Sequence, residues 1–175
     1  MDKRVRLLQS TALAALTYNS GTWPRLTGSE QQLWTNGVMR LYKTVFGRVF
    51  SAEQQFHMTS EQILALAGLP SPDFLLAFQR VLQFGQYLQR HCDYFWALAG
   101  QDQAWLDLVR DDLCLMYSQV QGFTKLPSPC DEVSLDVWQD TWQRQPKKVV
   151  GIFKRARARF SVCLRMYARE HARWS

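Results

Sequence analysis

The chain has 175 residues, 47% of them hydrophobic, which is enough for one domain with a sizeable core and too few for two large ones. Its net charge of +6 is divided unevenly: residues 1–50 carry +5, residues 51–143 carry −8 and residues 144–175 carry +9. The four cysteines form no Cys-x-x-Cys pair and no histidine stands at metal-ligand spacing, which argues against zinc and favours reduced thiols in an intracellular protein, cytoplasmic or nuclear.

The first predicted element is a helix over residues 3–17. Basic residues at its start, Lys3, Arg4 and Arg6, precede an apolar stretch in the order of a secretion signal. Polar residues interrupt that stretch, however, and its apolar residues form a narrow helical stripe, so the pattern favours a core helix. No run approaches the ~18 apolar residues of a membrane-spanning helix, and we expect no transmembrane segment.

Capping signals predict the next three helices. A Ser-x-x-Gln capping box at Ser29 begins a helix that ends at Gly47. A short helix over about residues 60–68 and a long one over about residues 71–90 follow, each opened by residues that favour a helix N-terminus. Gly85 lies in the apolar stripe of the long helix and predicts the close approach of another backbone.

A further helix is predicted over about residues 103–120, followed by a linker rich in Pro, Ser and Gly. A short helix and a long basic helix complete the chain. We therefore divide it into a helical domain (1–121), a linker (122–133) and a basic helical tail (134–175). Because strand-like alternation is nearly absent, the predicted fold is all-α: an irregular bundle of about five to six helices with a long basic amphipathic C-terminal helix.

The C-terminal tail is the most unusual segment, because residues 144–175 hold ten of the 21 Lys and Arg residues and one acid, Glu170. At ~100° per residue, a helix from Pro146 onward places most of these bases within an arc of about 140°. They are Lys147, Lys148, Lys154, Arg155, Arg159, Arg165, Arg169 and Arg173. The opposite side is apolar and holds Val149, Ile152, Phe153, Ala156, Phe160, Cys163, Leu164, Tyr167 and Trp174.

Such a helix can dock on a protein core while it offers its charge to a polyanion, either nucleic acid phosphates or an anionic membrane surface. One alternative is a solvated face that only keeps the protein soluble. Another, from a different functional class, is a helical interaction module whose tail docks through its apolar face on a protein partner or on the chain's own acidic middle.

A paired carboxylate, Asp111-Asp112, is the one hint of a metal site. Adjacent positions on a helix point about 100° apart, and no third ligand accompanies the pair, so we interpret it as structural. Asp112 falls among apolar positions, where we expect a buried carboxylate paired with an arginine such as Arg80 or Arg90.

Other catalytic signals are also missing from the sequence. The histidines lie far apart, and no Ser or Cys nucleophile is identified beside them: His57, His91 and His171. There is no Gly-x-Gly-x-x-Gly and no phosphate-binding loop. We therefore predict a protein that is not an enzyme and needs no cofactor and no metal.

The order of landmarks over about residues 4–115 resembles the segment that follows the catalytic palm in non-LTR (LINE-type) retrotransposon reverse transcriptases. The family's apolar-Tyr-Gly-Ser-Glu-x-Trp-like motif has a counterpart in residues 16–23, and its Leu-Arg-x-Ile-x-Gly-like helix in residues 39–47. Residues 80–90 are similar to its Arg-x-Leu-x-x-Leu-Gly-x-x-x-Arg pattern, and Trp105 followed by Asp112-Leu113 is similar to its Trp and later Asp-Leu.

The resemblance implies a thumb-like helical block that grips template and primer backbones, followed by an Arg-rich segment. It departs from the family at Asn19, where Gly is usual, at Gly21, where Glu is common, and in the missing Cys and His ligands downstream. The Tyr-x-Asp-Asp catalytic turn is also absent. We therefore expect a non-catalytic fragment derived from such an enzyme.

Together these observations predict weakly sequence-specific binding to the backbone of DNA or RNA. The predicted contacts are the eight bases of the tail face, assisted by three at the N-terminus: Lys147, Lys148, Lys154, Arg155, Arg159, Arg165, Arg169, Arg173, Lys3, Arg4 and Arg6. If six or so contact phosphates on duplex DNA, the log–log salt slope should be about −5.

Overall fold

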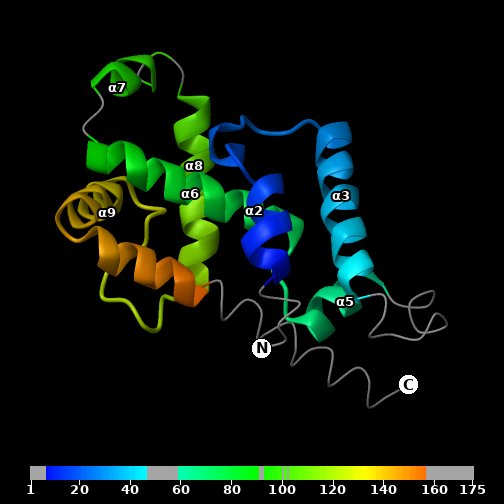
Figure 1. The fold of residues 1–175 in the computed structure, drawn as a ribbon. Helices are drawn as coiled ribbons and strands as arrows, with labels where there is room; N and C mark the ends of the chain where they lie inside the picture. The colour runs from blue at the N-terminus through cyan, green and yellow to red at the C-terminus, as the bar shows by residue number, and fades with distance from the viewer. Residues whose placement is uncertain (1–6, 47–58, 91–92, 100, 102, 157–175) are drawn as a thin grey trace. The chain divides into compact units, whose positions relative to one another are not determined.

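A computed structural model describes residues 7–46, 59–90, 93–99, 101 and 103–156. Within these ranges the regular structure is entirely helical and contains no strand, which confirms the predicted all-α class (Figure 1). In chain order the elements are η1 (Leu8–Ala12), α2 (Leu13–Leu16), η2 (Ser20–Thr22), α3 (Gly28–Phe46), α5 (Ser60–Ala67), α6 (Pro72–Arg90), α7 (Asp93–Ala99), α8 (Ala104–Ser118) and α9 (Glu132–Arg144). Residues 146–156 are also helical.

The described residues belong to two compact units. The first unit contains residues 7–18, 26–46 and 59–75, and the second contains residues 19–25 and the described residues between 76 and 156. The division into a domain, a linker and a tail stays a prediction. None of the helices in the described ranges combines the length and the apolar character needed to cross a bilayer.

Aromatic residues of α3 hold the core of the first unit together. Trp34 and Tyr42 lie on the same side of α3, and both are buried. The indole N–H of Trp34 donates to the carbonyl of Pro72 over 3.0 Å, and the hydroxyl of Tyr42 donates to the carbonyl of Pro70 over 3.2 Å. Each ring therefore buries its apolar body while its polar atom is satisfied by the chain that enters α6.

The N-terminus of α3 is capped differently from the prediction. Thr27 and Glu30 form the capping box: the backbone N–H of Thr27 donates to the Glu30 carboxylate over 2.8 Å, and the Glu30 N–H contacts the Thr27 hydroxyl over 3.4 Å. The predicted box at Ser29 is wrong. A carboxylate is a stronger hydrogen-bond acceptor than the side-chain amide of Gln32 and is also stabilised by the helix dipole. Glu30 therefore determines which residue caps the helix. The backbone hydrogen bond from Thr27 lowers the pKa of Glu30.

Helix α6 begins and ends as predicted. The hydroxyl of Ser71 accepts a hydrogen bond from the N–H of Phe74 over 3.2 Å, while Pro72 occupies the first helical position. The face of α6 expected from the sequence is buried at positions three, four and seven residues apart: Phe74, Phe78, Val81 and Leu88.

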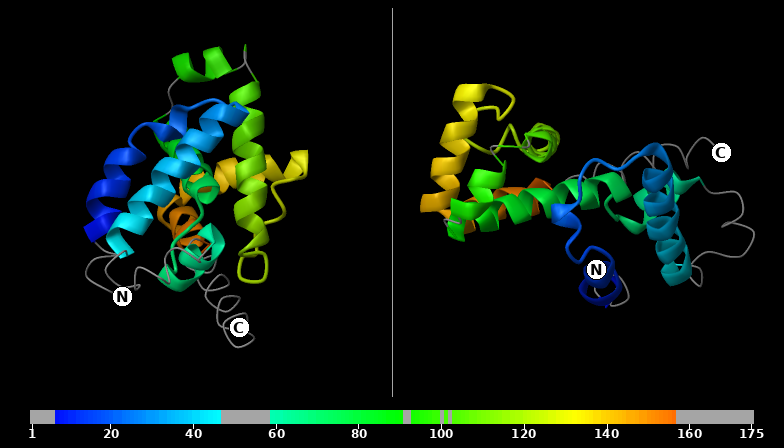
Figure 2. Two further views of the ribbon diagram at one scale, coloured as in Figure 1. Left: turned by 90° about the vertical axis from the view of Figure 1, so that its right-hand side faces the viewer. Right: turned by 90° about the horizontal axis from the view of Figure 1, so that it is seen from above.

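In the second unit, α8 crosses α6, while residues 146–156 lie alongside α6 and run in the opposite chain direction (Figures 1 and 2). Phe84 of α6 lies at the centre of an aromatic cluster, with ring centroids 6.1 Å from Trp96, 6.4 Å from Trp105 and 6.0 Å from Trp142. The helices of this unit therefore meet around one buried aromatic ring.

Gly85 allows a close approach, as the sequence predicted, but by a side chain and not by a backbone. The indole of Trp142 lies where a Cβ atom on Gly85 would be. Trp142 is fully buried, and its indole N–H has no hydrogen-bond partner within the described structure. A glycine is thus required at position 85 for the packing of α9 on α6.

A buried ion pair connects α6 to α8. Arg80 donates through Nε to Asp112 Oδ2 over 2.5 Å and through Nη2 to Oδ1 over 3.1 Å, so the contact is bidentate. Both side chains are 8% exposed. This confirms the sequence expectation of a buried Asp112 paired with an arginine.

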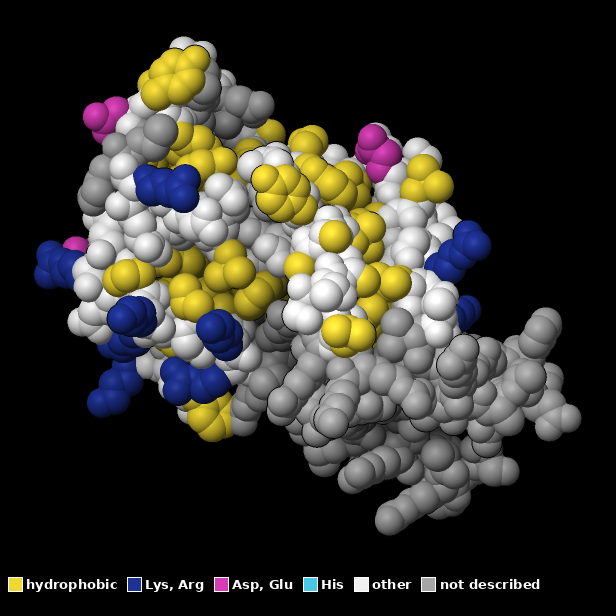
Figure 3. All heavy atoms as spheres, in the orientation of Figure 1, with side chains coloured by type: hydrophobic (Ala, Val, Ile, Leu, Met, Phe, Trp, Pro, Cys, Tyr) yellow, Lys and Arg dark blue, Asp and Glu magenta, His cyan; other side chains and the backbone are white. Residues whose placement is uncertain are grey.

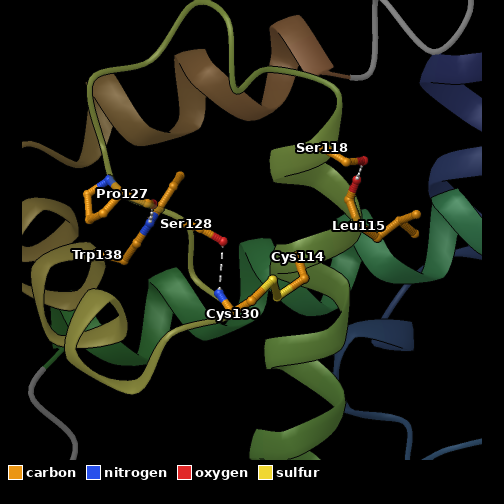
Figure 4. The surroundings of a disulfide bond; sticks show 7 residues. All are labelled: Cys114, Leu115, Ser118, Pro127, Ser128, Cys130 and Trp138. Carbon is orange, nitrogen blue, oxygen red and sulfur yellow. Dashed lines mark hydrogen bonds between the residues drawn. A yellow bond between two sulfur atoms is a disulfide. The ribbon is translucent and has the colours of Figure 1, made fainter.

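A disulfide joins Cys114 of α8 to Cys130, with 5.8 Å between the Cα atoms (Figure 4). The expectation of reduced thiols is therefore wrong for this pair. The sequence does not show that the linker folds back along α8, where the Tyr117 hydroxyl donates to the carbonyl of Leu126 and the indole of Trp138 to that of Pro127. Disulfides are typical of oxidising compartments, and the intracellular location stays a prediction.

Candidate nucleic-acid interface

The first turn of the basic helix is set by the break after α9. Gln145 leaves the helical conformation, with φ −135° and ψ 59°. Pro146 then occupies the first position of the new helix, where its missing N–H costs nothing. The carbonyl of Gln145 accepts from the N–H groups of Lys148 and Val149 over 3.0 and 3.3 Å, so the chain turns sharply and continues as a helix.

The apolar face of this helix is buried within the second unit. Its buried residues are the four that the helical wheel predicts over this stretch: Val149, Ile152, Phe153 and Ala156. The ring of Phe153 stacks on Trp138, with centroids 5.7 Å apart, and is tilted against Trp142 at 5.2 Å. These contacts fix the rotation of the helix about its axis and hence the direction of its opposite face.

The opposite face carries four exposed cations: Lys147, Lys148, Lys154 and Arg155. They form two adjacent pairs seven residues apart, which at the rise of an α-helix is about 10 Å. None of the four has an ion pair among the described residues. Figure 3 shows Lys and Arg side chains gathered around this part of the second unit. We call these four residues the basic face.

Two further exposed cations of the second unit were not among the predicted contacts. Lys125 is exposed on the loop that the disulfide attaches to α8. Arg144, at the end of α9, is exposed but pairs with Asp140 one turn earlier over 2.8 Å. Lys125 carries no sequence signal, because it stands alone in a linker and only the folded loop shows its exposure.

The remaining predicted contacts lie outside the described residues: Lys3, Arg4, Arg6, Arg159, Arg165, Arg169 and Arg173. The structure therefore brings together four of the eleven predicted residues, and those four belong to one helical surface.

Both carboxylates of the Asp111-Asp112 pair in α8 form ion pairs with arginines. Asp112 pairs with Arg80, and Asp111 pairs with Arg25 over 2.7 Å. Burial raises the pKa of Asp112, while the hydrogen bond from Arg80 opposes that shift. Across the described ranges, no three His, Cys, Asp or Glu residues are grouped as metal ligands would be. The three histidines lie outside these ranges.

Comparisons with protein-family models, with curated proteins and with solved structures found no match to this chain.

Proposed function

We propose that the second unit binds the phosphate backbone of nucleic acid through its basic face, without catalysis and with weak sequence preference. The observation that carries this proposal is the orientation of Lys147, Lys148, Lys154 and Arg155 by a helix whose other side is fully packed. The helix fixes the backbone positions of these cations, so contact with phosphates orders their side chains but not the backbone.

The buried apolar face favours this proposal over docking of the tail on a protein partner. Val149 and Phe153 are completely buried within the second unit, so these side chains are not available to a protein partner. Over residues 146–156, the exposed side chains are the four cations of the basic face. We therefore expect this helix to bind a polyanion.

Salt dependence of binding tests the proposal. Fluorescence anisotropy with a labelled 20-base-pair DNA should give an affinity that falls steeply as salt rises, because each phosphate contact releases counterions. The double variant Lys147→Gln/Lys148→Gln should make the log–log slope less negative by about 1.8. A flat salt response of the unmodified chain would overturn the proposal.

A matched control removes the same charge elsewhere. Arg40 and Lys43 are exposed on α3 and line a wide polar groove of about 680 Å³ in the first unit. The variant Arg40→Gln/Lys43→Gln changes the net charge equally and should leave the slope unchanged. Equal losses in both double variants would mean that total charge, and not the basic face, determines binding.

We further propose that the chain derives from the region after the palm of a non-LTR reverse transcriptase. This proposal is supported by the order of the sequence motifs alone. Its test is the nucleotide sequence upstream of the Met1 codon, translated in all frames. An encoded palm with its Asp-Asp turn is the expected result, and intact non-coding sequence contradicts it.

A further inference from the structure

A small pocket in the second unit lies among α6, α7, α8 and α9. Its volume is about 130 Å³. The apolar wall combines residues of three helices: Phe84, Trp96, Leu106, Val109 and Leu113. Phe84 and Trp96 meet edge to face, with centroids 6.1 Å apart and planes at 83°. Since Phe84, Val109 and Leu113 are buried, the apolar wall forms the floor of the pocket.

Polar side chains form the rim of the pocket. Gln103 and Asp107 are exposed, and Arg110 and Gln139 are half-buried. The two amides each offer a donor and an acceptor, Asp107 accepts and Arg110 donates. An apolar floor with such a rim suits a flat ring whose faces are apolar and whose edge forms hydrogen bonds.

The volume of the pocket matches a single ring. An apolar cavity of about 150 Å³ holds one benzene molecule. The pocket is slightly smaller and open at its rim, so a six-membered ring fills it, whereas a fused two-ring system projects beyond the rim. A pyrimidine base combines this size with an edge of donors and acceptors.

We propose that this pocket takes the base of a pyrimidine nucleoside, either free or unstacked from a single strand. The case of a strand rests on the proposed function, because the basic face must hold the backbone while the base enters the pocket. A base in a duplex is stacked and paired and must first be extruded, so double-stranded nucleic acid gains nothing from this site.

Free nucleosides test the pocket independently of the basic face. Saturation-transfer NMR with uridine, cytidine and adenosine should show transfer to the two pyrimidines and none to adenosine. The variant Leu106→Trp fills the pocket from its half-buried side and should abolish the transfer. Leu115→Trp is the control, because Leu115 is exposed on the same helix and does not line the pocket.

Binding of a single strand provides the second test of the pocket. Leu106→Trp should weaken binding of a uridine dodecamer by about 5- to 160-fold, the effect of losing one base contact, and leave duplex binding unchanged. Gln139→Ala should weaken it less, and Gln143→Ala, one turn along α9 and outside the pocket, should not. Circular dichroism melting verifies that each variant folds.

The outcomes separate the two proposals. If Leu106→Trp folds and still binds the uridine dodecamer like the unmodified chain, or if adenosine binds as well as uridine, the pocket proposal is overturned. If the chain binds no strand but uridine transfer is lost in Leu106→Trp, the pocket proposal holds for the free nucleoside and the proposed function fails. Weaker strand binding by Lys147→Gln/Lys148→Gln, with uridine transfer retained, supports both.

Discussion

Two neighbouring carboxylates of α8 have opposite environments. Asp112 and its partner Arg80 are each 8% exposed, whereas Asp111 and its partner Arg25 are 65% and 71% exposed. The residues are identical in type and adjacent in sequence, and both form ion pairs. One step of about 100° around the helix separates a contact inside the unit from one in solvent.

This comparison shows which ion pair constrains the structure. Water screens the exposed pair, and holding two long side chains in place offsets most of its attraction. The buried pair has lost its hydration, which is why burial raises the pKa of Asp112, and it depends on the two hydrogen bonds from Arg80. We expect the buried pair to fix how α6 and α8 meet, and the exposed pair to add little.

The largest predicted effect is the removal of Arg80. Arg80→Met leaves the carboxylate of Asp112 buried without a partner and should lower the free energy of unfolding by about 3–5 kcal/mol. Urea denaturation followed by circular dichroism measures the change. A loss below ~1 kcal/mol would show that water reaches Asp112 and would remove the contrast with Asp111.

A double variant separates the loss of the pair from the presence of an unpaired charge. Arg80→Met/Asp112→Leu replaces both partners by apolar side chains and should be more stable than Arg80→Met alone. If the double variant is the less stable of the two, the ion pair itself contributes the stability.

Several of these features could be predicted from the sequence because they follow helical periodicity. The position of Asp112 in an apolar stripe predicted its burial and a partner such as Arg80. The spacing of Val149 and Phe153 predicted the packed side of the basic helix over the part of it that the structure describes. The capping residues Ser71 and Pro72 predicted where α6 begins, and its end was expected at about Arg90.

Features that depend on distant contacts could not be predicted. Helix α7 has seven residues, too few for a periodic signal to identify. The disulfide depends on the path of the linker back to α8, and the spacing of Cys114 and Cys130 carries no information on that path. The pocket requires four helices to meet, so none of its residues has a local signature.

The disulfide joins the loop before α9 to α8 through Cys130, which is exposed, and Cys114, which is half-buried. It closes a segment with a sequence separation of 16, so its loss should cost about 3 kcal/mol. Reduction with dithiothreitol and the variant Cys114→Ser/Cys130→Ser should lower the free energy of unfolding by similar amounts. As a control, the variant should not respond to the reductant. Equal stability of the oxidised and reduced chain would contradict a role for this link.

Two glycines, Gly85 and Gly151, differ in the space around them in the same way as the two carboxylates differ in exposure. A Cβ on Gly85 meets the indole of Trp142, whereas a Cβ on Gly151 has nothing within 4 Å. Gly85→Ala should therefore destabilise by about 1–3 kcal/mol. Gly151→Ala lies in a helix and should stabilise by up to ~1 kcal/mol. Thermal melting of both variants measures the difference, and effects of the same sign would contradict this packing.

The pH dependence of stability tests the environment of Asp112. Because burial raises its pKa above the usual 3.8, the folded chain binds more protons than the unfolded chain just above pH 3.8, and the contribution of Asp112 to stability falls as pH rises through this window. The unfolding free energy of the unmodified chain should therefore fall relative to that of Asp112→Asn between about pH 4 and neutral pH. A relative rise would mean that Arg80 outweighs desolvation.

The smallest effect is expected at Asp111. Asp111→Asn removes one partner of the exposed pair and should cost ~0–1 kcal/mol, decreasing with added salt. A double-mutant cycle with Arg25→Gln, measured by urea denaturation at low and high salt, isolates the pair energy. A coupling above ~2 kcal/mol that persists at high salt would show that Arg25 and Asp111 are shielded from water. A small coupling here beside a large loss at Arg80 would show that helix position decides what each carboxylate contributes.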